Sequence, residues 1–142
     1  KDSMGNVSVI RNGEIQVMSA STGITHSEYN KNGDQPVKFL QIWVFPDTQE
    51  VTPRYDQIKL DTDKMHNAFM RIVAPRDHKE EGAAWVHQNT WFSIGKMDEG
   101  KELTYKMMST DNGLYIFVLE GAVEDGGEKF GLRDGLGLRE TD

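Results

Sequence analysis

Short apolar stretches with a period of two, separated by turn-forming residues, constrain the fold of this chain most strongly. Apolar residues alternate with other residues at Val7 and Val9 and again at Ile15 and Val17, as half-buried β-strands require. Turn-forming groups recur between such stretches: Asn12-Gly13, Asn32-Gly33-Asp34, Asp98-Glu99-Gly100, Asp111-Asn112-Gly113 and Gly126-Gly127. Many short strands separated in this way predict an all-β barrel or sandwich.

Further strands are predicted where β-forming residues cluster. Val37–Phe45 is a nearly continuous apolar run, which predicts a strand buried on both faces. Other segments with strand-like composition are Ala68–Val73, Thr90–Ile94, Leu103–Met107 and Leu114–Val123. One short helix is expected near Asp61–Asn67. The charged stretch Pro75–Gly82 predicts a domain boundary, with residues 1–75 on one side and 76–142 on the other.

The two ends of the chain share a short pattern. Val9–Gln16 and Gly131–Leu138 each contain an aliphatic residue, then Arg, then Asn or Asp, then Gly, and Arg133 follows Arg11 at an offset of 122 residues. Both copies are predicted to join strands through the same kind of turn. A repeat of this length predicts a chain that begins partway through one unit and stops partway through the next.

Composition excludes several classes of protein. The chain has no cysteine, which excludes disulfides, thiolate nucleophiles, iron–sulfur clusters and Cys-ligated zinc. A formal net charge of −7 disfavours direct binding to nucleic acid. No apolar run approaches the roughly 20 residues of a membrane helix, and no signal peptide is visible. We therefore expect no membrane association and a cytoplasmic location.

His26-Ser27-Glu28 is the candidate site for chemistry. Residues at i and i+2 on an extended segment point to the same face, so the His26 imidazole and the Glu28 carboxylate could bind one divalent metal. This donor pair suits iron, manganese, nickel or copper, and two further ligands would be needed to hold the metal tightly. The alternative is a solvated pair at the end of a strand.

The remaining histidines and the tryptophans are interpreted as structural. His66, His78 and His87 do not lie at ligand spacing; the first two are expected in solvent and the third partly buried. The tryptophans at positions 43, 85 and 91 are predicted to pack in a core or interface rather than to form a ligand platform.

Along nearly all of its length, the chain resembles the pirin family. The resemblance is carried by Lys1–Asn6, Ile15–Glu28, Leu40–Val44, Pro53–Tyr55, Leu119–Val123 and Arg133–Leu138. It implies a bicupin, that is, two cupin barrels of the double-stranded β-helix or jelly-roll type, both incomplete in this chain. Residues 1–75 would hold the second half of the N-terminal cupin domain plus a connecting segment, and residues 76–142 the first part of the C-terminal cupin domain.

The resemblance also implies one mononuclear metal in the N-terminal barrel, usually iron, with manganese, nickel, copper and zinc as alternatives. Four side chains bind the metal in the family, namely a His-x-His pair and a His and a Glu that match His26 and Glu28. The His-x-His pair is expected upstream of Lys1, so this chain alone is expected to lack a complete site.

Some bacterial members of the family resemble quercetin 2,3-dioxygenases, which implies a flavonol-like aromatic substrate and Glu28 as a general base. Other members imply a non-enzymatic role, as redox-sensing transcription cofactors. A structural remnant without activity is a third interpretation. Homodimerisation or a domain swap through the edges of the incomplete barrels is expected, because such edges leave backbone groups unpaired.

Overall fold

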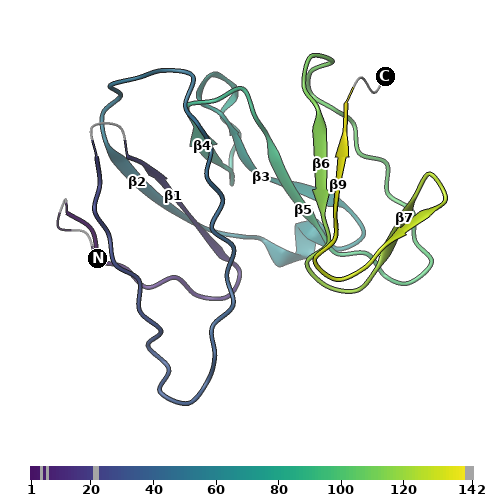
Figure 1. Ribbon diagram of the computed structural model, residues 1–142, viewed down its shortest axis with the longest axis horizontal. Helices are drawn as coiled ribbons and strands as arrows, with labels where there is room; N and C mark the ends of the chain where they lie inside the picture. Colours follow the sequence, from purple (N-terminus) through teal and green to yellow (C-terminus); the bar gives the residue numbers. More distant parts are fainter. Residues whose placement is uncertain (4, 6, 21–22, 140–142) are drawn as a thin grey trace. The chain divides into compact units, whose positions relative to one another are not determined.

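The protein is built from short β-strands, as the sequence predicts (Figure 1). The computed structural model describes residues 1–3, 5, 7–20 and 23–139. The elements among these residues are the strands β1 (Glu14–Ser19), β2 (Arg54–Lys59), β3 (Phe69–Pro75), β4 (Ala84–Val86), β5 (Phe92–Gly95), β6 (Leu114–Phe117), β7 (Val123–Asp125), β8 (Glu128–Phe130) and β9 (Gly135–Leu138), and the 3-10 helices η1 (Thr62–Met65) and η2 (Arg76–His78). The helix η1 lies inside the segment predicted to be helical.

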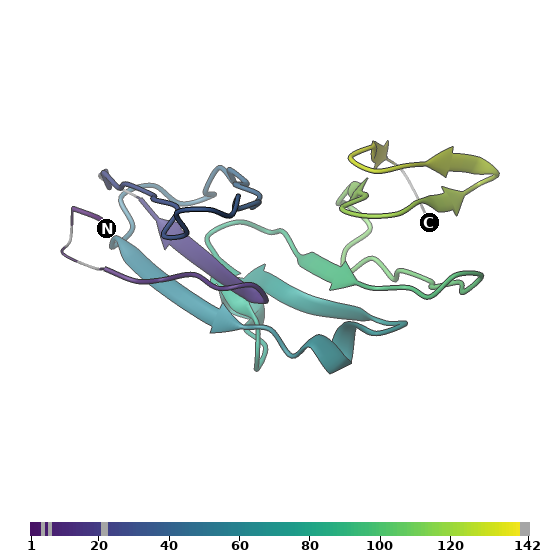
Figure 2. The ribbon, with the colours of Figure 1, turned by 90° about the horizontal axis from the view of Figure 1, so that it is seen from below.

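The chain divides into two compact units, Lys1–Leu103 and Thr104–Asp142. In the first unit, β1 pairs with β2 in an antiparallel ribbon, and β3 lies between β4, which is parallel to it, and β5, which is antiparallel. The long β1–β2 pair is visible in Figures 1 and 2. In the second unit, β6 pairs with β9 and β7 with β8, both antiparallel. The predicted domain division at residue 75 stays a prediction.

The strand β2 is not predicted by the sequence pattern, and it forms because it pairs with β1. Its sequence, RYDQIK, is polar and lacks apolar alternation, but Ile58 faces Ile15 across the ribbon. The Arg54 guanidinium lies 3.7 Å from the centre of the Trp85 ring and donates a 2.7 Å hydrogen bond to the Trp85 carbonyl oxygen. Burial lowers the pKa of Arg54, and Asp56, 2.9 Å away, opposes that shift. This contact ties β2 to β4.

The buried core is small. Its apolar members among the described residues are Leu60, Val73, Ala74, Pro75 and Ala84 in the first unit and Val118 in the second. The predicted strands around Ile15 and Val17, Ala68–Val73 and Thr90–Ile94 are confirmed as β1, β3 and β5. Leu60 directly follows β2 and Val118 directly follows β6, so each unit buries an aliphatic residue where a paired strand ends.

Four strand predictions need correction. The segment around Val7 and Val9 forms no strand, and these two residues are 73% and 37% exposed rather than half-buried. Val37–Phe45 forms no strand, and its large apolar side chains are mostly exposed rather than buried. Leu103–Met107 forms no strand either, and Leu114–Val123 is interrupted, because β6 ends at Phe117 and β7 begins at Val123. A strand needs a hydrogen-bonding neighbour as well as β-forming residues, and no described segment pairs with residues 37–45 or 103–107 in a sheet.

Glycine turns lie where the sequence predicts them. Gly126 and Gly127 have φ values of 59° and 84° and connect β7 to β8 in a two-residue hairpin. This conformation favours glycine, because a side chain at positive φ is sterically disfavoured.

The repeated pattern at the two ends corresponds to two turns of the same kind, Arg11–Glu14 and Gly131–Asp134. They align with each other differently from the alignment of the two sequences. The Arg11 amide donates to the Glu14 carboxylate at 2.7 Å, and the Gly131 amide donates to the Asp134 carboxylate at 2.8 Å. In each turn the fourth residue's amide also donates to the first residue's carbonyl oxygen at 3.0 Å. The third residues, Gly13 and Arg133, both have positive φ. The turns therefore align at an offset of 120 residues, two fewer than the aligned letters indicate.

Within the residues that the structure covers, no helix is both long enough and apolar enough to cross a membrane.

Candidate metal half-site

His26 lies on an extended segment that is aligned by the first residues of the chain. The Ser3 amide donates to the Thr25 carbonyl oxygen at 2.8 Å, and the Ser27 amide donates to the Lys1 carbonyl oxygen at 2.9 Å. The α-amino group of Lys1 donates back to the Ser27 carbonyl oxygen at 3.1 Å. These bonds flank the antiparallel bridge between Asp2 and His26.

Asp2 therefore faces His26 across the two segments. In an antiparallel pair, directly opposed residues project to the same face, and Glu28, two residues after His26, shares that face on an extended chain. Asp2 is 7% exposed and is the one buried charged or polar residue among those described. Carboxylates near a metal-ligating histidine commonly orient its ring. The sequence did not reveal Asp2, because only the register between the two segments brings it opposite His26.

The donor side chains fit part of a metal site. His26 and Glu28 are both exposed, so solvent or an added ligand can reach them. No cluster of three or more His, Asp or Glu side chains with metal-binding geometry occurs in the described residues. An imidazole nitrogen and a carboxylate suit a divalent transition metal, but two donors are fewer than a tight site needs.

The other histidines lie apart from this segment and have neighbours of their own. His66 is exposed and lies 2.9 Å from Asp98, His78 is exposed and contacts the Trp91 ring, and His87 is half-buried against the Trp85 ring. The expected environments of all three are confirmed. Trp85 and Trp91 are half-buried as predicted, whereas Trp43 is 82% exposed and its predicted packing is wrong for this chain.

The contact between His66 and Asp98 belongs to a small polar cluster. One Asp98 oxygen accepts from the Asn67 side-chain amide at 2.8 Å and lies 2.9 Å from His66 Nε2, while the Asp98 amide donates to Asn67 Oδ1 at 2.9 Å. The hydrogen bonds from Asn67 and His66 lower the pKa of Asp98. These hydrogen bonds connect the residues that follow η1 to Asp98, which follows β5. Among the described residues, the cluster contains no third His, Asp or Glu side chain that could bind a metal.

Comparison with known proteins identifies relatives along the whole chain. Residues 1–44 match the family model described as Pirin, and residues 72–142 match the model described as Quercetinase C-terminal cupin domain. The chain is 32% identical over 138 residues to the quercetin 2,3-dioxygenase of Escherichia coli K12, covering 97% of this chain and 57% of that protein. It is 35% identical over 145 residues to a putative quercetin 2,3-dioxygenase of Mycobacterium tuberculosis, covering 100% of this chain and 57% of that protein.

Among solved structures, the fold is similar to that of the bacterial pirin YhhW from Escherichia coli in complex with nickel(II). The TM-score is 0.83 at 29% identity, and the match covers 97% of this chain and 57% of that chain. This chain therefore spans little more than half the length of the relatives that it matches. The two family models, the relatives and the shared all-β architecture agree: the chain belongs to the pirin family of cupin proteins.

Proposed function

We propose that His26 and Glu28 supply two of the ligands of a mononuclear divalent-metal site, and that the protein to which this chain belongs uses the site in a quercetin 2,3-dioxygenase-type reaction. The single observation that carries the proposal is the placement of His26 and Glu28 on one exposed extended segment, with His26 held opposite the buried Asp2. The similarity to proteins named as quercetin 2,3-dioxygenases and to a nickel(II)-bound pirin supports this proposal.

Each residue has a defined part in the proposed site. The His26 ring would offer one nitrogen to the metal, and the Glu28 carboxylate would offer an oxygen. A bound divalent metal would act as a Lewis acid towards the substrate oxygen. Glu28 would also accept the proton of an aromatic hydroxyl group, because a carboxylate is a general base when it lies within hydrogen-bonding reach. Iron is the metal we propose, with nickel, manganese, copper and zinc as the alternatives that the assay distinguishes.

Metal content measured by elemental analysis tests the first half of the proposal. We expect a form extended on the N-terminal side of Lys1 to hold about one equivalent of metal, because it can add the two further ligands that a tight site needs. His26→Ala and Glu28→Gln should each lose most of that metal. His66→Ala and Glu99→Gln are matched controls, since both positions are exposed and lie outside the proposed site. Equal metal content in all five proteins would contradict the assignment.

Oxygen uptake with quercetin tests the second half. The extended, metal-loaded protein should consume oxygen in step with quercetin. If Glu28 is the base, Glu28→Gln should slow turnover by on the order of 100-fold or more per bound metal ion, beyond the loss of metal itself. Full metal occupancy without oxygen uptake would reject the dioxygenase activity and leave metal binding intact. That outcome would favour the redox-sensing role.

A further inference from the structure

The backbone pairing between the start of the chain and the segment around His26 has a defined geometry. Its antiparallel bridge joins Asp2 and His26. Backbone hydrogen bonds flank this pair on both sides and join Ser3 to Thr25 and Lys1 to Ser27. Asp2 and His26 therefore form a non-hydrogen-bonded pair, in which opposed Cα atoms lie about 4.5 Å apart and the side chains are closer than in a hydrogen-bonded pair.

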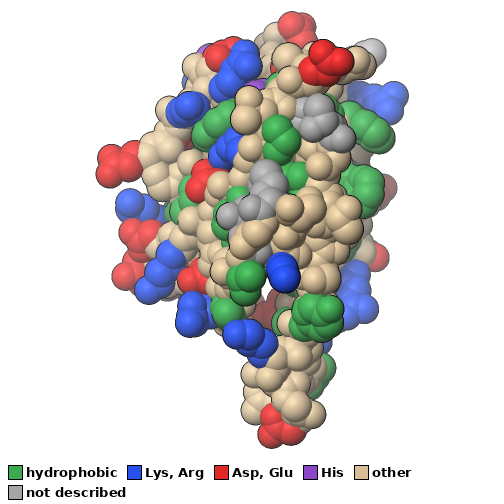
Figure 3. All heavy atoms as spheres, turned by 90° about the vertical axis from the view of Figure 1, so that its left-hand side faces the viewer, with side chains coloured by type: hydrophobic (Ala, Val, Ile, Leu, Met, Phe, Trp, Pro, Cys, Tyr) green, Lys and Arg blue, Asp and Glu red, His purple; other side chains and the backbone are tan. Residues whose placement is uncertain are grey.

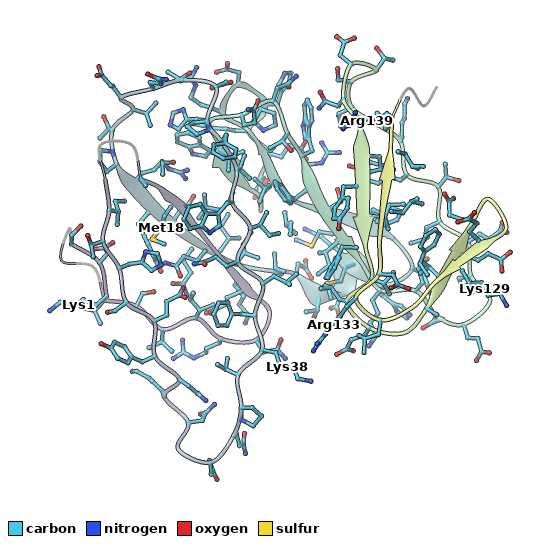
Figure 4. All side chains as sticks on the ribbon, viewed as in Figure 1. Lys1, Met18, Lys38, Lys129, Arg133 and Arg139 are labelled. Carbon is cyan, nitrogen blue, oxygen red and sulfur yellow. The ribbon has the colours of Figure 1, made fainter. Side chains whose placement is uncertain are left out.

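The two neighbouring side chains at the start of the chain differ in their burial. Lys1 is exposed, and Figure 4 shows its labelled side chain extending away from the ribbon, whereas Asp2 is only 7% exposed. Successive side chains of an extended segment alternate between its two faces, so Asp2 lies on the face that His26 shares. A carboxylate has about four acceptor positions, so Asp2 can accept an N–H from the His26 ring in addition to the interaction that it already makes.

A histidine that binds a metal through one ring nitrogen carries a proton on the other, and that N–H needs an acceptor. The Cβ atoms of directly opposed residues lie about 4.5–5.5 Å apart, so an aspartate oxygen and an imidazole nitrogen can approach to hydrogen-bonding distance. We propose that Asp2 is a positioning residue of the metal site: its carboxylate accepts a hydrogen bond from the His26 ring nitrogen that does not bind the metal. This inference rests on the proposed function, in which His26 is a ligand.

The hydrogen bond from His26 to Asp2 would have two effects on metal binding. It fixes the orientation of the ring and the nitrogen that carries the proton, and the negative charge of the carboxylate makes the other nitrogen a stronger ligand. Burial favours both effects, because a carboxylate shielded from water interacts more strongly with its neighbours. Asp2 acts through His26 and does not touch the metal, so its loss should weaken metal binding without abolishing it.

The protonation pattern of the His26 ring tests the pairing without any metal. Ring-nitrogen NMR shifts, recorded on the metal-free protein extended on the N-terminal side of Lys1, show which nitrogen carries the proton when the ring is neutral. We expect one tautomer in the wild type and a mixture of both in Asp2→Ala. Asp34→Ala, which removes an exposed carboxylate outside the bridge, is the matched control and should keep one tautomer.

Two readings protect this test against a general loss of structure. Amide hydrogen exchange at Ser3 and Ser27 reports whether the bridge stays closed in each variant, because both amides donate across it. If Asp2→Ala opens the bridge, Asp2→Asn keeps the size of the side chain and takes its place. A mixture of His26 tautomers in the wild type would overturn the inference, whatever the variants show.

Nickel(II) affinity of the same extended protein, measured by competition with a chelator, is the second measurement. Asp2→Ala should bind nickel roughly 10–100-fold more weakly and still reach one equivalent at saturation. Asp2→Asn keeps a neutral acceptor oxygen and should lie between Asp2→Ala and the wild type, whereas His26→Ala should lose most of the metal. Unchanged nickel affinity in Asp2→Ala would overturn the inference and leave the proposed function intact. A wild type that binds no nickel, iron or other divalent metal would contradict the proposed function, and the inference would fall with it.

Discussion

At the scale of single residues, the Asp98 cluster links stability to pH. Hydrogen bonds from Asn67 and His66 lower the pKa of Asp98 below its ordinary value of 3.8. A carboxyl with a lowered folded-state pKa contributes stability that is present above its unfolded pKa and is lost as pH falls through the folded value. We expect the free energy of unfolding by urea to fall with acidification below about pH 4. The decline should be shallower in Asp98→Asn.

The matched control for this prediction is Glu99→Gln, which changes the neighbouring, exposed carboxylate. Glu99→Gln should leave the decrease in the free energy of unfolding at acidic pH unchanged. Identical profiles for the wild type and Asp98→Asn would mean that the hydrogen bonds around Asp98 do not differ between the folded and unfolded states.

At Gly95, a close contact with the backbone leaves no room for a side chain. A Cβ atom at Gly95 would lie 2.9 Å from the Ala68 carbonyl oxygen, so the backbone would have to move. We expect Gly95→Ala to lower the free energy of unfolding by about 1–3 kcal/mol, as other overpacked sites do. Gly33→Ala is the control, because no atom lies within 4 Å of its added Cβ. Chemical denaturation of both variants measures the difference, and equal stabilities would show that the contact relaxes freely.

At the scale of elements, the two turns closed by a carboxylate, Arg11–Glu14 and Gly131–Asp134, can be compared by mutation. Glu14 accepts a hydrogen bond from the Arg11 amide and a second, at 2.9 Å, from the Gln57 side-chain amide, so it connects its turn to β2. Asp134 bonds the Gly131 amide in the equivalent turn. Removing an acceptor from a charge-assisted bond costs about 1.5–3 kcal/mol, and Glu14→Ala should cost more than Asp134→Ala because Glu14 has two such bonds.

Amide hydrogen exchange measures the effect of each substitution on each turn separately. Exchange should accelerate at Arg11 in Glu14→Ala and at Gly131 in Asp134→Ala, with no transfer of the effect between turns. Glu14→Gln keeps a carbonyl acceptor and should lie between Glu14→Ala and the wild type. Unchanged exchange at Arg11 in Glu14→Ala would show that the turn does not depend on this carboxylate.

At the scale of the whole molecule, the net charge opposes association of two chains. Two chains that each carry a formal charge of −7 repel one another, and salt screens that repulsion. The screening length falls from about 30 Å at 0.01 M salt to about 10 Å at 0.1 M. We expect self-association of the chain to be several-fold tighter at the higher salt concentration, measured by sedimentation velocity. Weaker association at 0.1 M salt would indicate that attraction between charges, rather than apolar contact, holds the two copies together.

Surface composition is relevant at this scale as well. Figure 3 shows hydrophobic side chains open at the surface among acidic and basic ones. Covering the exposed segment Val37–Phe45 removes apolar surface from water, which is the favourable term that must exceed the charge repulsion.

The sequence by itself determined the all-β class, the glycine turns and the strands β1, β3 and β5. These features depend on local spacing and on the conformational preferences of neighbouring residues, and both can be read along the chain. The pirin resemblance, which rests on the same residues, is confirmed by the family models.

Only the tertiary structure decided which β-forming segments became strands. Arg54–Lys59 is polar and forms β2, whereas Val37–Phe45 is apolar and stays unpaired, because a strand exists only where a neighbour satisfies its backbone. The same reason applies to the candidate site. The spacing of His26 and Glu28 can be read from the sequence, but the register with Lys1–Ser3, which brought the buried Asp2 opposite His26, depends on hydrogen bonds between segments more than 20 residues apart.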